Sequence, residues 1–235
     1  MIVGDYIMKR YLKNMNALSA KEIEILNNSK VCVIGCGGLG GYIIEMLARI
    51  GVGYITAIDG DIFDETNLNR QIVSHTQNLG KGKAEETKNR IKLVNPHIDV
   101  KAIKAMIDES NAIPLIRNHN VIVDALDNIK TRVILQSASE KLNIPMVHGA
   151  IGGFYGQVTT IFPNDKTLDF LYPRDIKADK GAEQELGNPS FIPPLVASIQ
   201  VAEVIKILIN RGDLLRRKVL FLDLLNNNFD LVEFK

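Results

Sequence analysis

Short apolar runs alternate with segments of helical periodicity in the first part of the chain. Residues 31–34 form a continuous apolar run that leads into the glycine-rich stretch 35–40. The apolar positions over 43–50 recur at helical spacing, and 54–58 is a second apolar run. A buried strand, a glycine turn, a helix and a second strand make a βαβ unit, which is the building block of a parallel sheet.

The same alternation continues along the chain. Helices are predicted at residues 83–94, 131–142 and 193–210. Strands are predicted at residues 100–105, 121–126, 145–148, 157–162 and 219–225. Glycines between the third and fourth of these strands indicate that parallel winding gives way to antiparallel strands. We therefore expect an α/β fold, with a Rossmann-like, mostly parallel sheet flanked by helices and antiparallel strands in the C-terminal half.

The length of 235 residues fits a single α/β domain with a substantial core. Ser19, followed three residues later by Glu22, is the pattern of a capped helix start. Residues 164–190 are largely polar and contain several glycines and prolines, which is typical of a long mobile loop. The predicted parts are a helical arm at about 1–28, a core at about 29–162, this loop, and a C-terminal helix and strand at about 191–235.

Charge and cysteine content argue against several classes of protein. The 28 basic and 27 acidic residues give a net charge of +1, which provides no large field to attract nucleic acid or an anionic membrane. Residues 1–16 lack a sustained apolar run, so we expect neither a signal peptide nor a membrane anchor. Cys32 and Cys36 cannot supply a disulfide framework or a zinc cage. We expect a cytoplasmic protein without structural zinc.

Three glycines between the first strand and its helix suggest a phosphate site. Gly35, Gly37 and Gly40 form a GxGxxG pattern, which allows a tight turn and close approach of a phosphate to the positive end of a helix. Asp59 ends the second strand, about 20 residues further on, where an acidic residue holds ribose hydroxyls. The pattern predicts nucleotide binding, although nicotinamide-dependent oxidoreductases and some turns without a ligand share it.

Three charged residues in later segments favour a triphosphate over a dinucleotide. Arg70 and Lys83 are cations suited to phosphate, and both follow the second strand. Asp127 follows the predicted strand 121–126, at the edge where ligands bind in an open α/β sheet. Mg²⁺ is commonly bound by one or two carboxylates together with substrate phosphates. We therefore expect a triphosphate with Mg²⁺ here, with Asp127 serving the metal and Asp124 a structural role.

Taken in order, these motifs resemble those of the ThiF/MoeB/HesA family, relatives of the adenylation domain of ubiquitin-activating enzymes. The motifs are Arg10-Tyr11, residues 35–40, Asp59-Gly60-Asp61, Asn67-Leu68-Asn69-Arg70-Gln71, Gly80 with Lys83, Asp127-Asn128 with Arg132, and residues 200–206. The resemblance covers almost the whole chain and implies an ATP-dependent adenylyltransferase. The implied nucleotide site comprises Gly35, Gly37, Gly38, Gly40, Asp59, Asp61, Asn67, Asn69, Arg70, Gln71, Lys83, Asp127 and Asn128.

The resemblance also implies roles and partners. Arg70, Lys83 and Asp127 would be catalytic, acting on the phosphates and on Mg²⁺. In the implied homodimer, a basic residue of the N-terminal arm reaches the partner's ATP; the candidates are Arg10 and Lys13, and Lys13 stands where an arginine is usual. The implied substrate is the C-terminal carboxylate of a small ubiquitin-like sulfur carrier, of the ThiS or MoaD type, that ends in Gly-Gly. Attack of this carboxylate on the α-phosphate would form an acyl adenylate and release pyrophosphate.

The chain departs from the family pattern in its cysteines. Many relatives have a cysteine before the final long helix and two CxxC zinc pairs, and this chain has neither. A separate persulfide donor would then supply the sulfur. Cys36 lies near a helix N-terminus, which can lower the pKa of a thiol, although plain packing is the simpler interpretation. His148 ends a predicted strand near the crevice and is a weaker candidate for contact with substrate.

Other functions stay open from the sequence alone. A tRNA threonylcarbamoyladenosine dehydratase of the same superfamily also adenylates a carboxylate, but it would normally need a basic face, which the net charge disfavours. A nicotinamide-dependent oxidoreductase would leave Arg70, Lys83 and Asp127 unexplained. A non-catalytic partner subunit would be expected to have lost one of these three residues.

Overall fold

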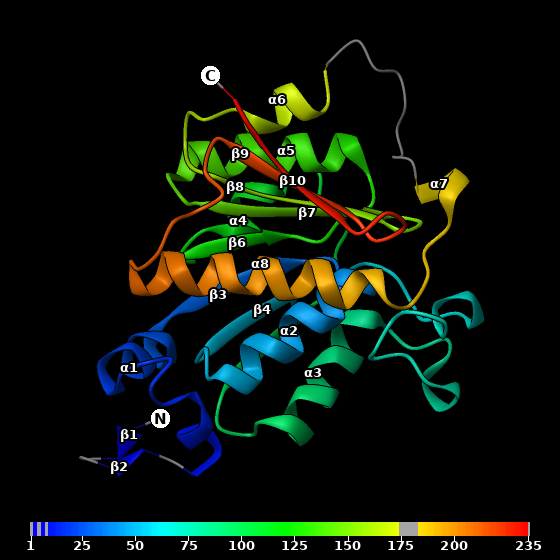
Figure 1. Ribbon diagram of the computed structural model, residues 1–235. Helices are drawn as coiled ribbons and strands as arrows, with labels where there is room; N and C mark the ends of the chain where they lie inside the picture. Colours follow the sequence, from blue (N-terminus) through cyan, green and yellow to red (C-terminus); the bar gives the residue numbers. More distant parts are fainter. Residues whose placement is uncertain (1, 4–5, 8, 174–182, 235) are drawn as a thin grey trace.

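The computed structural model (Figure 1) describes residues 2–3, 6–7, 9–173 and 183–234. The helices are η1 (Lys9–Asn14), α1 (Ala20–Asn28), α2 (Gly38–Ile50), η2 (Glu65–Asn67), η3 (Thr76–Asn78), α3 (Lys83–Val94), α4 (Ala112–Ile116), α5 (Ile129–Leu142), α6 (Thr167–Leu171), α7 (Glu183–Leu186) and α8 (Ile192–Ile209). The strands are β1 (Ile2–Val3), β2 (Tyr6–Ile7), β3 (Lys30–Ile34), β4 (Tyr54–Ile58), β5 (Asp99–Ile103), β6 (Val121–Asp124), β7 (Met146–Gly152), β8 (Tyr155–Ile161), β9 (Lys218–Asp223) and β10 (Asn228–Glu233).

An eight-stranded sheet organises the molecule, in the order β10-β9-β8-β7-β6-β3-β4-β5. The pairs from β5 across to β7 are parallel, and those from β7 across to β10 are antiparallel. The chain runs outward from β3 to β4 and β5, then returns to place β6 on the other side of β3. This reversal opens a crevice at the carboxyl ends of β3 and β6, which is where open α/β sheets bind ligands.

Helices cover both faces of the sheet (Figure 1). Alternate residues of β3 divide between two apolar clusters, with Val31 and Val33 in one and Cys32 and Ile34 in the other. The first cluster contains residues of α1, α2, α3 and α8, and the second contains residues of α4, α5 and α6. Because β3 is buried on both faces, it reads as a continuous apolar run. The predicted mixed, Rossmann-like sheet is confirmed.

Local signals explain where several helices begin and end. Ser19 caps α1 and forms a capping box with Glu22, as predicted. Gly51 ends α2 in the left-handed region at φ 103°, a conformation that glycine adopts without steric cost. Asn143 and Asn210 end α5 and α8 in the same region. These left-handed residues mark where the three helices end.

Three sequence predictions need correction, and one helix was missed. The N-terminal arm is not wholly helical, because β1 and β2 form a short antiparallel pair. Residues 164–190 are not irregular throughout, since α6 and α7 form there; residues 174–182 lie outside the described part of the chain. α4 was not predicted. Strand 219–225 is shorter than expected, and it turns back as β10 where Asp223 accepts hydrogen bonds from the backbone N–H groups of Leu225 and Asn226.

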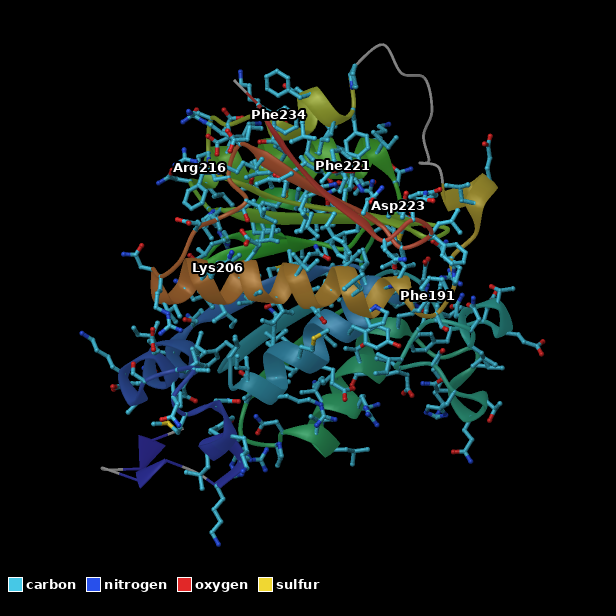
Figure 2. All side chains as sticks on the ribbon, viewed as in Figure 1. Phe191, Lys206, Arg216, Phe221, Asp223 and Phe234 are labelled. Atoms are coloured by element: carbon cyan, nitrogen blue, oxygen red, sulfur yellow. The ribbon has the colours of Figure 1, made fainter. Side chains whose placement is uncertain are left out.

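The C-terminal segments pack differently on the two sides of the sheet. Phe234, just beyond β10, stacks on Phe170 of α6 at 5.5 Å between ring centroids (Figure 2). α8 is long and apolar enough to cross a membrane by length and composition alone. In this fold, however, α8 packs against α2, β7 and β8 and supplies residues of the first apolar cluster. Its hydrophobicity is therefore that of a core helix.

Candidate functional site

A pocket lies over the carboxyl ends of β3, β4 and β6, at the reversal of strand order. Its lining includes ten of the thirteen nucleotide-site residues that were predicted to come from the same chain. These ten are Gly35, Gly37, Gly38, Asp59, Asp61, Arg70, Gln71, Lys83, Asp127 and Asn128. The fold therefore brings together segments that are far apart in the sequence, at the position that the topology predicts.

The glycine loop has two different kinds of glycine. A Cβ on Gly40 would lie 1.7 Å from the carbonyl oxygen of Gly35, and Gly35 itself has a φ of +96°. These two glycines therefore allow the loop to pack tightly on the first turn of α2. The nearest atom to a Cβ on Gly37 would be Gln71 Nε2 at 3.5 Å, and on Gly38 an Arg70 carbon at 3.7 Å. The backbone of Gly37 and Gly38 thus faces the pocket, whereas Gly40 serves the packing behind it.

Asp59 ties the glycine loop to the end of β4. Its Oδ2 accepts a hydrogen bond from the backbone N–H of Cys36 at 2.7 Å, and its Oδ1 accepts one from the N–H of Asp61 at 2.8 Å. The same carboxylate lines the pocket. A carboxylate whose two oxygens each accept a hydrogen bond from a backbone N–H is held rigidly, which suits a group that must orient a ligand.

Two cations reach the pocket from segments after β4. Lys83 begins α3, and its Nζ lies 3.2 Å from Asp61 Oδ2. Arg70 donates from Nη1 to the Thr66 carbonyl oxygen at 3.1 Å and to Asn69 Oδ1 at 2.8 Å. Both side chains line the pocket and are fixed before any ligand arrives.

Asn67 and Asn69 support this turn and, in the described part of the chain, do not line the pocket. The carbonyl oxygen of Asn67 accepts hydrogen bonds from the N–H groups of Arg70 and Gln71, at 3.2 and 3.0 Å. The side chain of Asn69 bridges Arg70 and the backbone oxygen of Asn188. Asn67 and Asn69 therefore act by holding Arg70 and its neighbours in position.

Three long helices begin at this pocket. Gly38 and Lys83 are the first residues of α2 and α3, Asn128 is the N-cap of α5, and all three line the pocket. Free backbone N–H groups and the helix dipoles make such termini favourable for anions. Asp127, exposed beside the α5 terminus, faces the same space. The pocket thus combines anion-binding termini and cations with the exposed carboxylate of Asp127.

Sequence reasoning did not assign part of the pocket wall. Ala105, Met106 and Ile107 after β5 form an apolar section, while Ile151 and Asn188 come from segments after β6. Local patterns give no signal for these residues, because each reaches the pocket through the folding of a distant segment.

Arg132, which carried part of the family resemblance, lines the pocket and is held by a polar network. Arg132 donates to the carbonyl oxygen of Leu126 and to the Tyr172 hydroxyl. His148 is completely buried, with Nδ1 2.7 Å from Asp124 Oδ2 and Nε2 3.2 Å from the Tyr172 hydroxyl. His148 is therefore buried within this network and, in the described part of the chain, does not line the pocket, while Asp124 has the expected structural role.

Cys36 has the opposite of a reactive environment. Its side chain is completely buried, and burial, together with the nearby Asp59 carboxylate, raises the pKa of the thiol well above its usual value. The sequence-based possibility of a lowered pKa is wrong, because desolvation outweighs the helix terminus. Plain packing accounts for this residue.

The N-terminal arm divides the two candidate basic residues. Arg10 Nη1 donates to Asn95 Oδ1 at 2.6 Å, so it is bound within its own chain at the end of α3. Lys13 is exposed in the last turn of η1 and, among the described residues, is not part of its own chain's pocket. Of the two, Lys13 is the one whose position leaves it available to another molecule.

Comparisons with known proteins agree with this geometry. A family model described as "ThiF family" matches residues 10–235. The chain is 34% identical over 213 residues to the SAMP-activating enzyme E1 of Haloferax volcanii, covering 89% of this chain and 78% of that protein. It is 32% identical over 217 residues to the sulfur carrier protein adenylyltransferase of Thermus thermophilus, covering 88% and 79%. The fold is also similar to that of the crystal structure of E. coli MccB with ATP, with a TM-score of 0.81. The sequence identity is 22%, and the match covers 99% of this chain and 73% of that one. The chain belongs to the ThiF family.

Proposed function

We propose that this protein is an ATP-dependent adenylyltransferase that activates the C-terminal carboxylate of a small ubiquitin-like sulfur carrier. The observation that carries this proposal is the meeting of Arg70, Lys83, Asp127 and three helix N-termini in one pocket. A dinucleotide needs only one such terminus, whereas a triphosphate offers enough negative charge to use them all. Relatives named as a SAMP-activating enzyme and a sulfur carrier protein adenylyltransferase support the substrate class.

Different sections of the pocket wall suit the adenine, the ribose and the phosphates of ATP. The apolar wall formed by Ile58, Met106 and Leu126 suits the adenine ring, and Asp59 offers a carboxylate to the ribose hydroxyls. The backbone of Gly37 and Gly38, at the start of α2, together with Arg70 and Lys83, receives the phosphates. The MccB structure with ATP supports this ligand for the fold.

The residues around Asp127 fit Mg²⁺ that arrives with the nucleotide. In the described part of the chain, no group of three His, Cys, Asp or Glu side chains is arranged to hold a metal. One carboxylate facing a phosphate site is the arrangement that Mg²⁺ commonly uses, since it keeps several waters and binds phosphate oxygens. When bound, Mg²⁺ would neutralise charge on the phosphates of ATP, with Asp127 as its protein ligand.

The reaction requires little acid–base chemistry from the protein. The substrate carboxylate is ionised at neutral pH and attacks the α-phosphorus directly; a new carboxyl oxygen–phosphorus bond forms as the bond to the pyrophosphate oxygen breaks. Arg70 and Lys83 stabilise the charge that develops on the leaving pyrophosphate. The remaining contribution is alignment of the two reactants in the pocket.

Three further parts belong to this proposal. The active form is a homodimer in which Lys13 of one chain reaches the ATP of the other. A separate persulfide donor supplies sulfur to the adenylate, because Cys32 and Cys36 are both buried. The cytoplasm is the compartment, where two free thiols stay reduced.

The test is exchange of labelled pyrophosphate into ATP, measured with Mg²⁺ and with candidate carriers ending in Gly-Gly. We expect carrier-dependent exchange that falls by about 10²–10³-fold in Arg70→Ala, Lys83→Ala and Asp127→Ala. Lys81→Ala is a matched control, since Lys81 is an exposed lysine two residues from Lys83 and outside the pocket lining. ATP binding without exchange for any carrier, combined with salt-sensitive tRNA binding, would favour the dehydratase instead; binding of NAD but not ATP would refute the proposal.

A further inference from the structure

Two side-chain oxygens at the pocket have no hydrogen-bond partner among the described residues. They are Oε1 of Gln71 and Oδ1 of Asn188, and both atoms are buried. Gln71 as a whole is 6% exposed, and both residues line the pocket. Because buried polar groups are nearly always hydrogen-bonded, two unpartnered acceptors in one pocket indicate a ligand with hydrogen-bond donors.

Both residues are held in place by contacts that leave these oxygens available. The backbone N–H of Gln71 donates to the Asn67 carbonyl oxygen at 3.0 Å. The Asn188 carbonyl oxygen accepts from Asn69 Nδ2 at 3.0 Å. The segment around Asn188 is fixed further by the hydrogen bond from Gly153 N to the Gly187 oxygen at 2.7 Å. The two acceptors therefore come from separate, anchored segments.

An aromatic contact beside Asn188 strengthens this anchoring. Phe191, at the start of α8, lies 4.9 Å from Phe154 between ring centroids. Figure 2 shows Phe191 at the end of α8 that adjoins the chain leading from α7. Asn188 is thus placed between a backbone hydrogen bond at Gly187 and a ring contact at Phe191. Its side chain belongs to a fixed part of the wall.

The position of the acceptors shows which part of the reactants they face. Gln71 Nε2 is the nearest neighbour to the Cβ position of Gly37, and Asn69 connects Asn188 to Arg70. Both residues are therefore at the phosphate end of the proposed ATP site. Phosphate oxygens are acceptors and cannot satisfy them, and the ribose hydroxyls are assigned to Asp59 on β4. The attacking carboxylate arrives at this end, and it is attached to backbone N–H donors.

We propose that Gln71 Oε1 and Asn188 Oδ1 accept hydrogen bonds from the last backbone N–H groups of the substrate tail. The two oxygens hold the tail extended and align its carboxylate with the α-phosphorus. Gln71 and Asn188 are positioning residues for the acyl substrate and not ligands of the nucleotide. This inference rests on the proposed function and deepens it, since it identifies the part of the pocket that recognises a peptide.

The test replaces single N–H donors in the substrate. A sulfur carrier that supports pyrophosphate exchange is prepared by chemical ligation with an ester in place of its last or its penultimate peptide bond. Each ester removes an N–H group and preserves the carboxylate and the chain length. In the wild-type enzyme we expect at least one ester to lower kcat/KM by about tenfold, the effect of one lost hydrogen bond of roughly 1.4 kcal/mol.

Variants assign the effect to each oxygen. Gln71→Met and Asn188→Leu remove the acceptors on two independent segments. In each variant the corresponding ester should lower kcat/KM by less than about twofold. The Kd for ATP in the absence of carrier should stay within about twofold of wild type. Gln77→Met is the matched control, because Gln77 is exposed on η3 outside the pocket lining. It should keep the full tenfold ester effect.

The outcomes separate the inference from the function. Equal ester effects in the wild type and both variants would overturn the inference while leaving adenylation intact. A loss of ATP affinity in the variants without carrier would assign the oxygens to the nucleotide and also overturn it. If ATP binds but no carrier supports exchange, the proposed function fails first. If one variant does not fold, the other tests the same claim from a different segment.

Discussion

Replacing Gly40 by alanine should damage both the stability and the ATP site of this protein. The added Cβ would lie 1.7 Å from the Gly35 oxygen and 2.7 Å from the Gly35 carbonyl carbon. Relief requires a shift of more than about 1 Å, because non-bonded carbon and oxygen atoms stay above roughly 3 Å. Gly35 cannot make this shift, since a Cβ placed on Gly35 would lie only 2.5 Å from the Ala125 oxygen, so the Ala125 backbone is packed directly against it. The first turn of α2 must therefore move away from the loop.

The free-energy cost of this movement is partly offset by the higher helix propensity of alanine. Overpacking a backbone contact of this kind costs about 3 kcal/mol or more, and alanine in place of glycine within a helix returns about 1 kcal/mol. We expect the free energy of unfolding to fall by about 2 kcal/mol. Movement of α2 also disturbs the hydrogen bond from Cys36 N to Asp59, so ATP affinity should drop by at least about tenfold.

Gly41→Ala is the matched control in the same helix. There the added Cβ would lie 3.3 Å from methyl carbons of Ile72 and Val73, which are side-chain atoms that can move by a few tenths of an ångström. Its free energy of unfolding should stay within about 1 kcal/mol of wild type. Urea denaturation and calorimetric titration with ATP measure both quantities. If the free energies of unfolding of Gly40→Ala and Gly41→Ala lie within about 0.5 kcal/mol of each other, the close approach of Gly40 to Gly35 does not limit stability.

Two further predictions concern charge and reactivity. Burial acts to raise the pKa of Asp165, but hydrogen bonds from Arg216 and the Phe162 backbone outweigh it and hold the pKa below its usual value. The stability that the ionised Asp165 contributes is fully present above the unfolded pKa of about 3.9 and is lost as pH falls through the folded pKa. In urea titrations, Asp165→Asn should therefore lower the free energy of unfolding by about 2 kcal/mol at pH 7, and this deficit should shrink toward pH 2. A deficit independent of pH would contradict the ion-pair account. Cys36 should resist iodoacetamide at pH 8 while the protein is folded, and Cys36→Ala should retain pyrophosphate exchange; rapid alkylation or lost exchange would show that the thiol is exposed or required.

The hydrophobic pattern predicted those helices and strands in which buried residues recur at regular intervals. The run of β3, the glycine turn and α2 were readable because each buries a regular set of positions. β10 was not, because all six of its residues are exposed and carry no inside–outside alternation. α4 and α6 have five residues each, too few to establish a helical period. Burial, more than propensity, decided what the sequence revealed.

The candidate site divides in the same way. Residues on the turns directly after β3, β4 and β6 were predictable, since strand ends and glycine patterns mark them. Met106 and Asn188 were not, because nothing local distinguishes a residue that a distant segment carries to the pocket wall. Asn67 shows a further difficulty: a polar residue within a motif can act by holding its neighbours. A motif identifies the segment, and the structure distinguishes the residues that face the ligand from those that support them.

The charges at the pocket indicate how a nearly neutral chain can bind a triphosphate. Asp124 lies 3.9 Å from Arg132 Nε, and Asp61 pairs with Lys83, so each of these cations is partly balanced before a ligand arrives. In residues 9–173 and 183–234, Arg70 instead hydrogen-bonds the neutral oxygens of Thr66 and Asn69. Its charge is therefore the least compensated of the three. Arg70→Ala should accordingly weaken ATP binding itself more than Lys83→Ala does, while the helix termini provide the attraction that net charge does not.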